Sequence, residues 1–126
     1  MTEVMAQGAT IPWHKHDNAE EILILEEGGA EVMVGDKRAV AGPRSIVFIP
    51  RNTWASATNT SARDIHLVAV FSRHGFEDYM RAISVRPGEP LTPMSPEELT
   101  RLRTRGHATY WDSSKGTAPP GTAPPR

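Results

Sequence analysis

Short apolar runs separated by turn residues recur about every eight to twelve positions between Ile11 and Phe71. The run Glu21–Leu25 is rich in strand-forming residues and is followed by glycines, and the run Ile46–Ile49 ends at Pro50. Runs of four or five residues are long enough for strands but too short for helices of ordinary length. This rhythm predicts an all-β sandwich or barrel.

The same reasoning predicts further strands within this region. A hairpin is expected where Glu31–Val34 and Arg38–Val40 flank the turn residues 35–37. Two more strands are expected at Ala55–Asn59 and Ile65–Phe71. In the last of these, alternation puts the residues of odd number on one face and those of even number on the other.

The pattern changes from strand to helix after Phe71. Apolar residues fall at helical spacing over Phe76–Ser84, which predicts a short amphipathic helix. A second helix is expected to begin with Ser95 as its N-cap and Glu98 as the capping partner, and to end at Gly106. The barrel therefore carries a short helical C-terminal extension.

The chain has the size of one domain, which we place at residues 1–111. The segment 112–126, with two tandem copies of Gly-Thr-Ala-Pro-Pro, has little to bury and is predicted to be a flexible tail. The chain has no cysteine, no recognisable signal peptide and no apolar run long enough to span a membrane. With a net charge of -1, nothing favours nucleic acid or a membrane as a partner, and we expect a cytoplasmic protein.

Two histidines and a glutamate are candidate metal ligands. His14 and His16 are two residues apart, so on a strand both imidazoles lie on one face. Glu21 shares a strand face with Leu23 and Leu25, which are expected to line the barrel interior. Taken singly, such histidines are often solvated, and a Glu-Glu pair is often a charged strand end. Together they can chelate one divalent ion.

The segment that contains these residues resembles the first conserved motif of the cupin superfamily. That motif has a glycine, a His-x-His pair, a glutamate and a second glycine, which Gly8, His14, His16, Glu21 and Gly28 match in identity and spacing. The spacing to the second glycine also selects the second of the two adjacent glutamates. The resemblance implies a double-stranded β-helix (jelly-roll) barrel, a divalent metal (Fe, Mn, Ni, Zn or Cu) and a homodimer.

The second cupin motif is matched only in part. Gly42, Pro50 and Asn59 fit it, but Asn52 stands where glycine is usual. Ala55 stands where the family has a fourth metal ligand, a histidine, and alanine cannot coordinate a metal. If the fold is right, the Ala55 side chain points into the barrel and leaves space beside the other ligands.

Four explanations of Ala55 are open. The site can be a triad of two histidines and one carboxylate with open metal positions. His66 on a neighbouring strand can substitute, although its face is shared with valines. The metal can be weak or absent, which leaves a polar pocket. Ala55 can also be an engineered replacement of a ligand histidine.

Several large apolar residues are expected around the pocket, and their identities do not define a substrate. For the two tryptophans a purely structural role is the favoured interpretation. The predicted pocket residues are Trp13, Leu23, Leu25, Phe48, Trp54 and Phe71. Both faces of Ile22–Leu25 and Ile46–Ile49 are apolar, and a barrel hides only the inner one, so a homodimer is expected.

The favoured function is that of a metal-dependent enzyme acting on a small organic molecule. The cupin resemblance includes dioxygenases and isomerases, and the sequence does not choose between an oxygenase and an isomerase. The alternative is a non-catalytic cupin that binds a small molecule and has a degenerate metal site. Neither the catalytic residues nor the substrate follow from the sequence.

Overall fold

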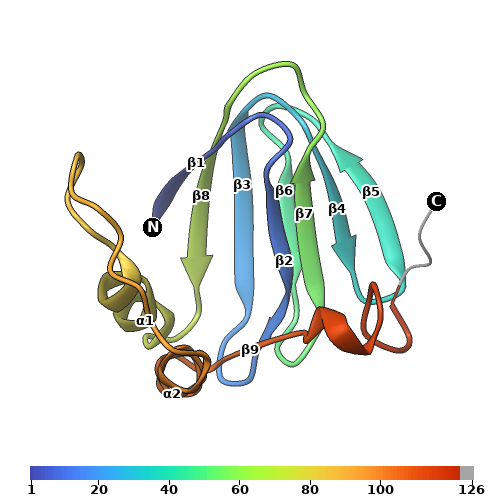
Figure 1. The fold of residues 1–126 in the computed structure, drawn as a ribbon. Coiled ribbons are helices and arrows are strands. Elements are labelled where there is room, and N and C mark those ends of the chain that lie inside the picture. The colour runs from blue at the N-terminus through green and yellow to red at the C-terminus, as the bar shows by residue number, and fades with distance from the viewer. Residues whose placement is uncertain (123–126) are drawn as a thin grey trace.

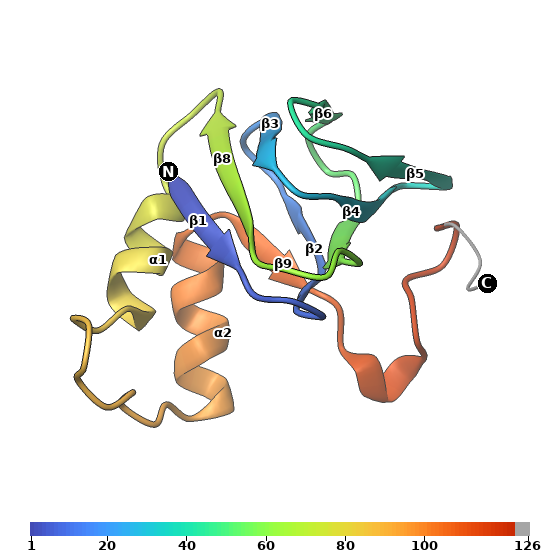
Figure 2. The same ribbon diagram turned by 90° about the horizontal axis from the view of Figure 1, so that it is seen from above.

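A computed structural model of the chain describes residues 1–122 as two packed β-sheets with helices along one side (Figures 1 and 2). The four-stranded sheet contains, in spatial order, β1 (Thr2–Met5), β8 (Ile65–Phe71), β3 (Glu21–Glu27) and β6 (Ile46–Ile49). The five-stranded sheet contains β5 (Lys37–Ala41), β4 (Ala30–Val34), β7 (Ala55–Asn59), β2 (Thr10–His16) and β9 (Ala108–Tyr110). The prediction of an all-β jelly-roll barrel is confirmed.

Comparison of the observed with the predicted strands shows which strands the sequence pattern was sufficient to locate. The predicted strands at residues 46–49, 55–59 and 65–71 coincide with β6, β7 and β8. The prediction missed β1 and β9. These strands contain four and three residues, so alternation within them is too brief to be recognised. Both lie at sheet edges, where they extend the two sheets toward the helices (Figure 2).

The helical extension consists of α1 (Phe76–Ile83) and α2 (Pro96–Arg105), followed by a 3-10 turn, η1 (Ser113–Lys115). As predicted, Ser95 caps α2, because its Oγ accepts the backbone N–H of Glu98 at 3.1 Å. Both helices lie beside β1 and β9, where the two sheets open (Figure 2). Among residues 1–122, no helix combines the length and apolarity that a membrane crossing requires.

The core lies between the two sheets and includes one polar residue of the second motif. Leu25, Ile65 and Leu67 are fully buried there. Asn59, with 2% exposure, donates through its amide to the carbonyls of Met5, Ala6 and Arg63 and accepts two bonds from Ser61. Asn59 therefore fastens the end of β7 to the end of β1 and to the loop before β8.

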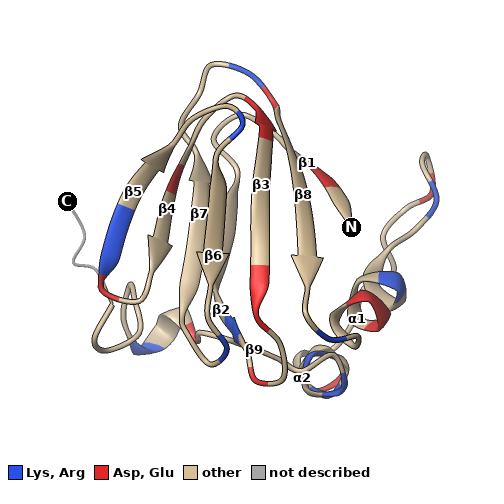
Figure 3. Cartoon of the chain, turned by 180° about the vertical axis from the view of Figure 1, so that it is seen from behind, with Lys and Arg blue, Asp and Glu red and all other residues tan. Residues whose placement is uncertain are grey.

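The outer face of the four-stranded sheet is apolar. It exposes valine, isoleucine and phenylalanine side chains, namely Val4, Ile22, Ile46, Phe48 and Val70. Neither β6 nor β8 contains a lysine, arginine, aspartate or glutamate, as the uncharged strands in Figure 3 show. An apolar face of this kind favours association. The homodimer stays a prediction.

The residue before the predicted tail is bonded to the five-stranded sheet, and the tail itself begins with a capped turn. The backbone N–H of Trp111 donates to the carbonyl of Trp13 at 2.9 Å, and Asp112 caps η1. Within 112–122, Pro119 is buried. The last four residues of the predicted tail, 123–126, lie outside the described residues.

Gly28, the last residue of the first motif, has a steric reason to be glycine. Its φ is +81°, and an added Cβ would overlap Cγ2 of the fully buried Ile65. Gly8 also has a positive φ, +74°, but an added Cβ there meets nothing within 4 Å. The two positions therefore share the backbone cost of a left-handed conformation, and Gly28 alone adds a core clash.

We expect Gly28→Ala to destabilise the protein by at least about 3 kcal/mol and Gly8→Ala by about 1 kcal/mol. Urea denaturation of the two variants and the wild type measures the difference. Equal losses in the two variants would show that the contact with Ile65 relaxes at no cost.

Candidate metal site

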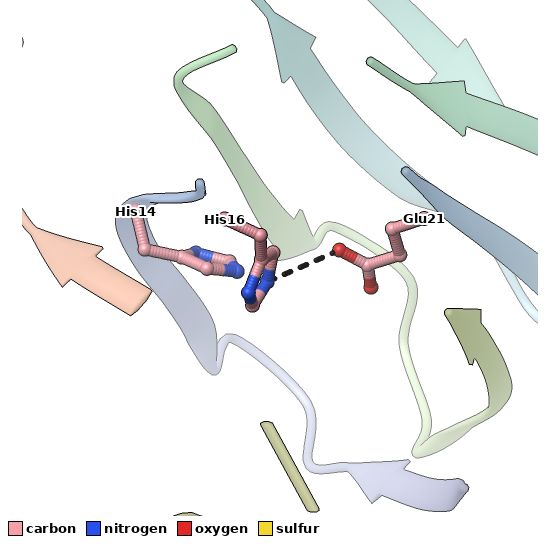
Figure 4. Close-up of side chains that lie close together, drawn as sticks. All are labelled: His14, His16 and Glu21. Atoms are coloured by element: carbon pink, nitrogen blue, oxygen red, sulfur yellow. Dashed lines mark ion pairs between the residues drawn. The ribbon is translucent and has the colours of Figure 1, made fainter. Parts of the chain in front are cut away.

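Three buried side chains converge inside the barrel (Figure 4). His14 and His16 point inward from β2, and Glu21 points inward from the first residue of β3. Their exposures are 8%, 4% and 7%. One ligand atom from each of the three lies within 4.8 Å of the other two. Ligand atoms of a tetrahedral Zn²⁺ ion lie about 3.4 Å apart, so the side chains must draw together by about 1 Å to share one ion.

The hydrogen bonds of these side chains leave their ligand atoms free. Nδ1 of His14 lies 2.8 Å from the carbonyl oxygen of Pro12, and because that oxygen only accepts, Nδ1 carries the proton. The Nε2 lone pair of His14 is then available to a metal, in the arrangement common for histidine ligands.

Two of the converging atoms are buried polar atoms without a partner. Nε2 of His16 and Oε2 of Glu21 face each other at 3.5 Å, and neither has a hydrogen bond to any described residue. Leaving such atoms unpaired costs free energy, and a shared cation satisfies both at once. The donor set of two imidazoles and one carboxylate therefore fits a divalent transition metal.

Aromatic rings surround the imidazoles and hold their orientation. The ring of His16 packs edge-on against Phe71 at 5.1 Å and Phe76 at 4.6 Å between centroids. The ring of His14 stacks on Tyr110 of β9 at 5.2 Å. These contacts restrict ring rotation and exclude water from one side of the site.

Burial shifts the pKa values of all three groups toward their neutral forms. It lowers the pKa of His14, and it lowers that of His16 to about 3, with the neighbouring His14 adding to the effect. Burial also raises the pKa of Glu21 to about 7, and the negative charge of Glu3 contributes. Burial therefore favours the neutral imidazoles that coordinate a metal, whereas below about pH 7 Glu21 must first lose a proton.

Ala55, the position predicted to have lost a ligand, lies beside the candidate metal site. It is the register partner of His14 across β2 and β7, and its side chain is buried. Asn52, the substitute for the usual glycine just before it, has φ of 57°. Asparagine tolerates this left-handed conformation better than most residues, so the turn that leads into β7 is kept.

A cavity of about 310 Å³ adjoins the metal site. Its volume is at the small end for ligand pockets. His14, Glu21 and Ala55 line it from the strands, and Phe76 and Tyr79 close it from α1. The space left by Ala55 is therefore part of a larger chamber between the sheets and the helices.

Only one of the six predicted pocket residues lines this cavity. Leu23 does so, whereas Leu25 is fully buried in the core and Phe71 packs against His16. The prediction for Phe48 was wrong. Phe48 is 56% exposed, because Ile49 takes the inward position at that end of β6.

The substitute ligand and the two tryptophans are also placed elsewhere. His66 is exposed on the outer face of β8, because Ile65 and Leu67 take the inward positions, so it cannot complete the shell. Trp13 lies on the outer face of β2, beside Trp111. Trp54 packs against Trp111 at 6.0 Å and under the ammonium group of Lys15. Neither tryptophan lines the cavity.

Among the polar residues of the cavity that sequence reasoning missed, four can carry a charge or are tyrosines. Glu3 comes from β1, Tyr79 from α1, Arg103 from α2 and Tyr110 from β9. Tyr79 lies on the apolar face of a predicted helix, and this position could have indicated that its side chain points toward the barrel. The other three come from edge strands or from a helix without buried residues, and nothing in their local sequence marks them.

Comparisons with known proteins agree with this fold. A family model described as "Cupin domain" matches residues 1–71. No curated protein matches the chain. Solved structures similar to it include the cupin domain of Cnp3 from Schizosaccharomyces pombe, with a TM-score of 0.55, 20% identity and 69% of this chain covered.

Two further similar structures carry enzyme names. A predicted oxalate decarboxylase from Thermotoga maritima aligns with a TM-score of 0.54, 21% identity and 56% of this chain covered. An oxalate oxidase in complex with the substrate analogue glycolate aligns with a TM-score of 0.53, 23% identity and 56% covered. The alignments span 64%, 61% and 39% of the Cnp3, decarboxylase and oxidase chains. At these identities they show the fold, and with the family match they establish that this chain belongs to the cupin family.

Proposed function

We propose that the protein is a metal-dependent enzyme that acts on a small organic molecule. His14, His16 and Glu21 would bind the metal, and the positions on the Ala55 side would take substrate or water. One observation carries the proposal: three buried ligand atoms lie within 4.8 Å of one another, and two of their residues, His14 and Glu21, line a cavity large enough for a small molecule. A degenerate pocket has no reason to keep two unpaired buried polar atoms face to face.

The bound metal would act as a Lewis acid or a redox centre toward a ligand in the cavity. The protein residues supply the rest. The hydrogen bond from His14 to Pro12 fixes the tautomer that coordinates, and Phe71 and Phe76 hold the His16 ring. Phe76 and Tyr79 also cover the chamber and limit the access of water.

The placements narrow the explanations of Ala55. Because His66 is exposed on the outer face of β8, we favour the triad with open positions over a substituted fourth ligand. The rival function is a non-catalytic cupin that binds its ligand without turnover. The metal-loaded protein distinguishes the two, because only an enzyme converts a bound small molecule.

A metal titration of the purified protein tests the proposal. We expect one equivalent of Zn²⁺, Ni²⁺ or Fe²⁺ to bind, measured by calorimetry and elemental analysis. With Co²⁺ as a probe, added azide should change the visible spectrum, because open positions accept a further ligand. A protein that binds no metal, or whose Co²⁺ spectrum ignores azide, would contradict the proposal. Product formation from a panel of small carboxylic acids, followed by NMR and oxygen consumption, then separates the enzyme from the binder.

We expect the metal affinity to depend on pH through Glu21. Since the pKa of Glu21 is about 7 and that of His16 about 3, the proton displaced by the metal is the one on Glu21. Affinity should rise about tenfold per pH unit between about pH 5 and pH 7 and then level off. Calorimetry in buffers of different ionisation enthalpy counts the released proton. A midpoint near pH 6.5 with two protons released would show instead that the histidines titrate.

The same proton affects the metal-free fold. Because the folded pKa of Glu21 lies above its ordinary value of 4.5, its protonation stabilises the folded state fully below pH 4.5. That contribution is lost as the pH rises through 7. Added metal should therefore stabilise the protein most above pH 7, which thermal unfolding with and without metal measures.

A further inference from the structure

Arg103 reaches the cavity from the helical extension. It lies on α2, which buries none of its residues, yet its side chain lines the chamber beside the metal site. Its Nε donates to the hydroxyl of Tyr79 at 3.3 Å, and its Cζ lies 4.2 Å from the ring centroid of Tyr110. The two tyrosines therefore fix the guanidinium in one orientation.

The terminal nitrogens of this guanidinium are left for a ligand. Within residues 1–122, Nε is the only side-chain nitrogen of Arg103 with a hydrogen bond, and no carboxylate lies within ion-pair distance. By contrast, Arg81 on α1 forms an ion pair with Asp78 at 3.2 Å, and Arg101 on α2 forms one with Glu98 at 3.9 Å. A half-buried guanidinium with a free two-nitrogen edge matches the two oxygens of a carboxylate.

The guanidinium and the metal site belong to the same chamber. The ring of Tyr110 contacts both, since it lies 5.2 Å from the ring of His14 and 4.2 Å from Cζ of Arg103. Apolar side chains such as Leu23 and Ile83 make up much of the remaining wall. A ligand that matches these three parts of the cavity has a negatively charged end, an apolar body and an end that reaches the metal.

We propose that the cavity binds a small monocarboxylate, whose carboxylate pairs with the terminal nitrogens of Arg103 while its other end faces His14, His16 and Glu21. The proposal rests on the proposed function for the end at the metal and names the substrate class of that site. The Tyr79 hydroxyl accepts the Arg103 bond and also interacts with the Tyr110 hydroxyl, so both phenols lie beside the end of the cavity that would hold the carboxylate.

The charges favour a monocarboxylate over a phosphate ester. Arg103 is the one lysine or arginine among the cavity-lining residues described, and Glu3 and Glu21 line the same chamber. A single guanidinium balances one negative charge, whereas a phosphate ester carries between one and two negative charges near pH 7. The cavity of about 310 Å³ has room for about ten water molecules, which suits a compact acid.

The test uses the full chain and its matched arginine variants. Arg103→Gln removes the charge in the cavity, and Arg101→Gln removes a charge from the same helix at a side chain that is 71% exposed. The probes are acetate, butyrate and benzoate, together with benzyl alcohol and phenyl phosphate. Saturation-transfer NMR and calorimetry measure their binding to metal-free and Zn²⁺-loaded protein.

We expect at least one carboxylate to bind the wild type and Arg101→Gln equally, and to bind Arg103→Gln at least about tenfold more weakly. Arg103→Lys should recover only part of the loss, because an ammonium group cannot make the paired bonds. Zn²⁺ affinity should be unchanged in Arg103→Gln. A wild type that binds no Zn²⁺ but still binds a carboxylate through Arg103 would overturn the metal proposal and leave the carboxylate proposal standing.

Three results would overturn the carboxylate proposal itself. One is that no carboxylate probe binds the wild type at millimolar concentration. Another is that Arg103→Gln, shown to be folded by its thermal transition, binds the carboxylates as the wild type does. The third is that phenyl phosphate binds more tightly than benzoate and depends on Arg103, which would assign the position to phosphate esters.

Discussion

Replacing Glu21 with glutamine should weaken the binding of Zn²⁺ at least about a hundredfold, whereas Glu20→Gln should leave it unchanged. The two residues are neighbours in the sequence but face opposite sides of the sheet. Glu21 is 7% exposed and faces His16, while Glu20 bonds to Arg51 and Ser72 at the surface. Because the amide is neutral and a poor ligand, the variant loses the only anionic donor of the triad.

The stability of the metal-free variants separates a lost ligand from a lost fold. Ionised Glu21 is buried without a partner, so glutamine, which is neutral, should make the metal-free protein at least as stable above pH 7. Calorimetric titration with Zn²⁺ and urea denaturation at pH 8 measure the two quantities. A Glu21→Gln protein that still binds Zn²⁺ within about threefold of the wild type would show that the carboxylate is not a ligand.

Replacing Ala55 with histidine should tighten metal binding at least about tenfold. Residue 55 lies opposite His14 across β2 and β7 and lines the cavity, so an imidazole there reaches the same ion. A further imidazole–metal bond contributes more than ~1.4 kcal/mol after the side chain is ordered. The new ligand also occupies an open position, so the Co²⁺ form should respond less to azide.

Ala55→Phe is the matched control for this change, because it fills the same space with a ring that cannot coordinate. It should leave the metal affinity near that of the wild type, whereas Ala55→His raises it. If the enzyme uses the open position, Ala55→His should lower turnover while metal binding tightens. Equal metal affinities for Ala55→His and the wild type would mean that residue 55 is misplaced relative to the ion.

The cluster of His14, His16 and Glu21 could be predicted from the sequence because local geometry brings the three residues together. His14 and His16 share a face by strand alternation, and Glu21 starts the next strand along the chain. Only a short connection separates the two strands, so the histidines and the glutamate must lie near each other in the fold. The same alternation correctly distinguished Glu21 from Glu20.

The other end of the cavity could not be predicted for a physical reason. Tyr110 and Arg103 reach it only because β9 pairs with β2 across more than ninety residues of sequence, for example through the partners His14 and Tyr110. Such long-range pairing leaves no periodic signal in the segment that supplies it. The prediction that Phe48 lines the pocket was wrong for a related reason, because the sequence of a four-residue strand with two apolar faces does not show which face is inside.

The close approach of the helices at Gly106 has a consequence for how this barrel can be altered. An added Cβ there would lie 2.7 Å from Cβ of Tyr79, so the end of α2 seats directly on α1. The family match stops at residue 71, and the residues after it supply Tyr79, Arg103 and Tyr110 to the chamber. The segment after residue 71 thus supplies part of the cavity wall without supplying any of the three candidate ligands. We expect a different C-terminal segment, grafted onto the same barrel, to change which ligand the cavity accepts while His14, His16 and Glu21 stay buried where they are.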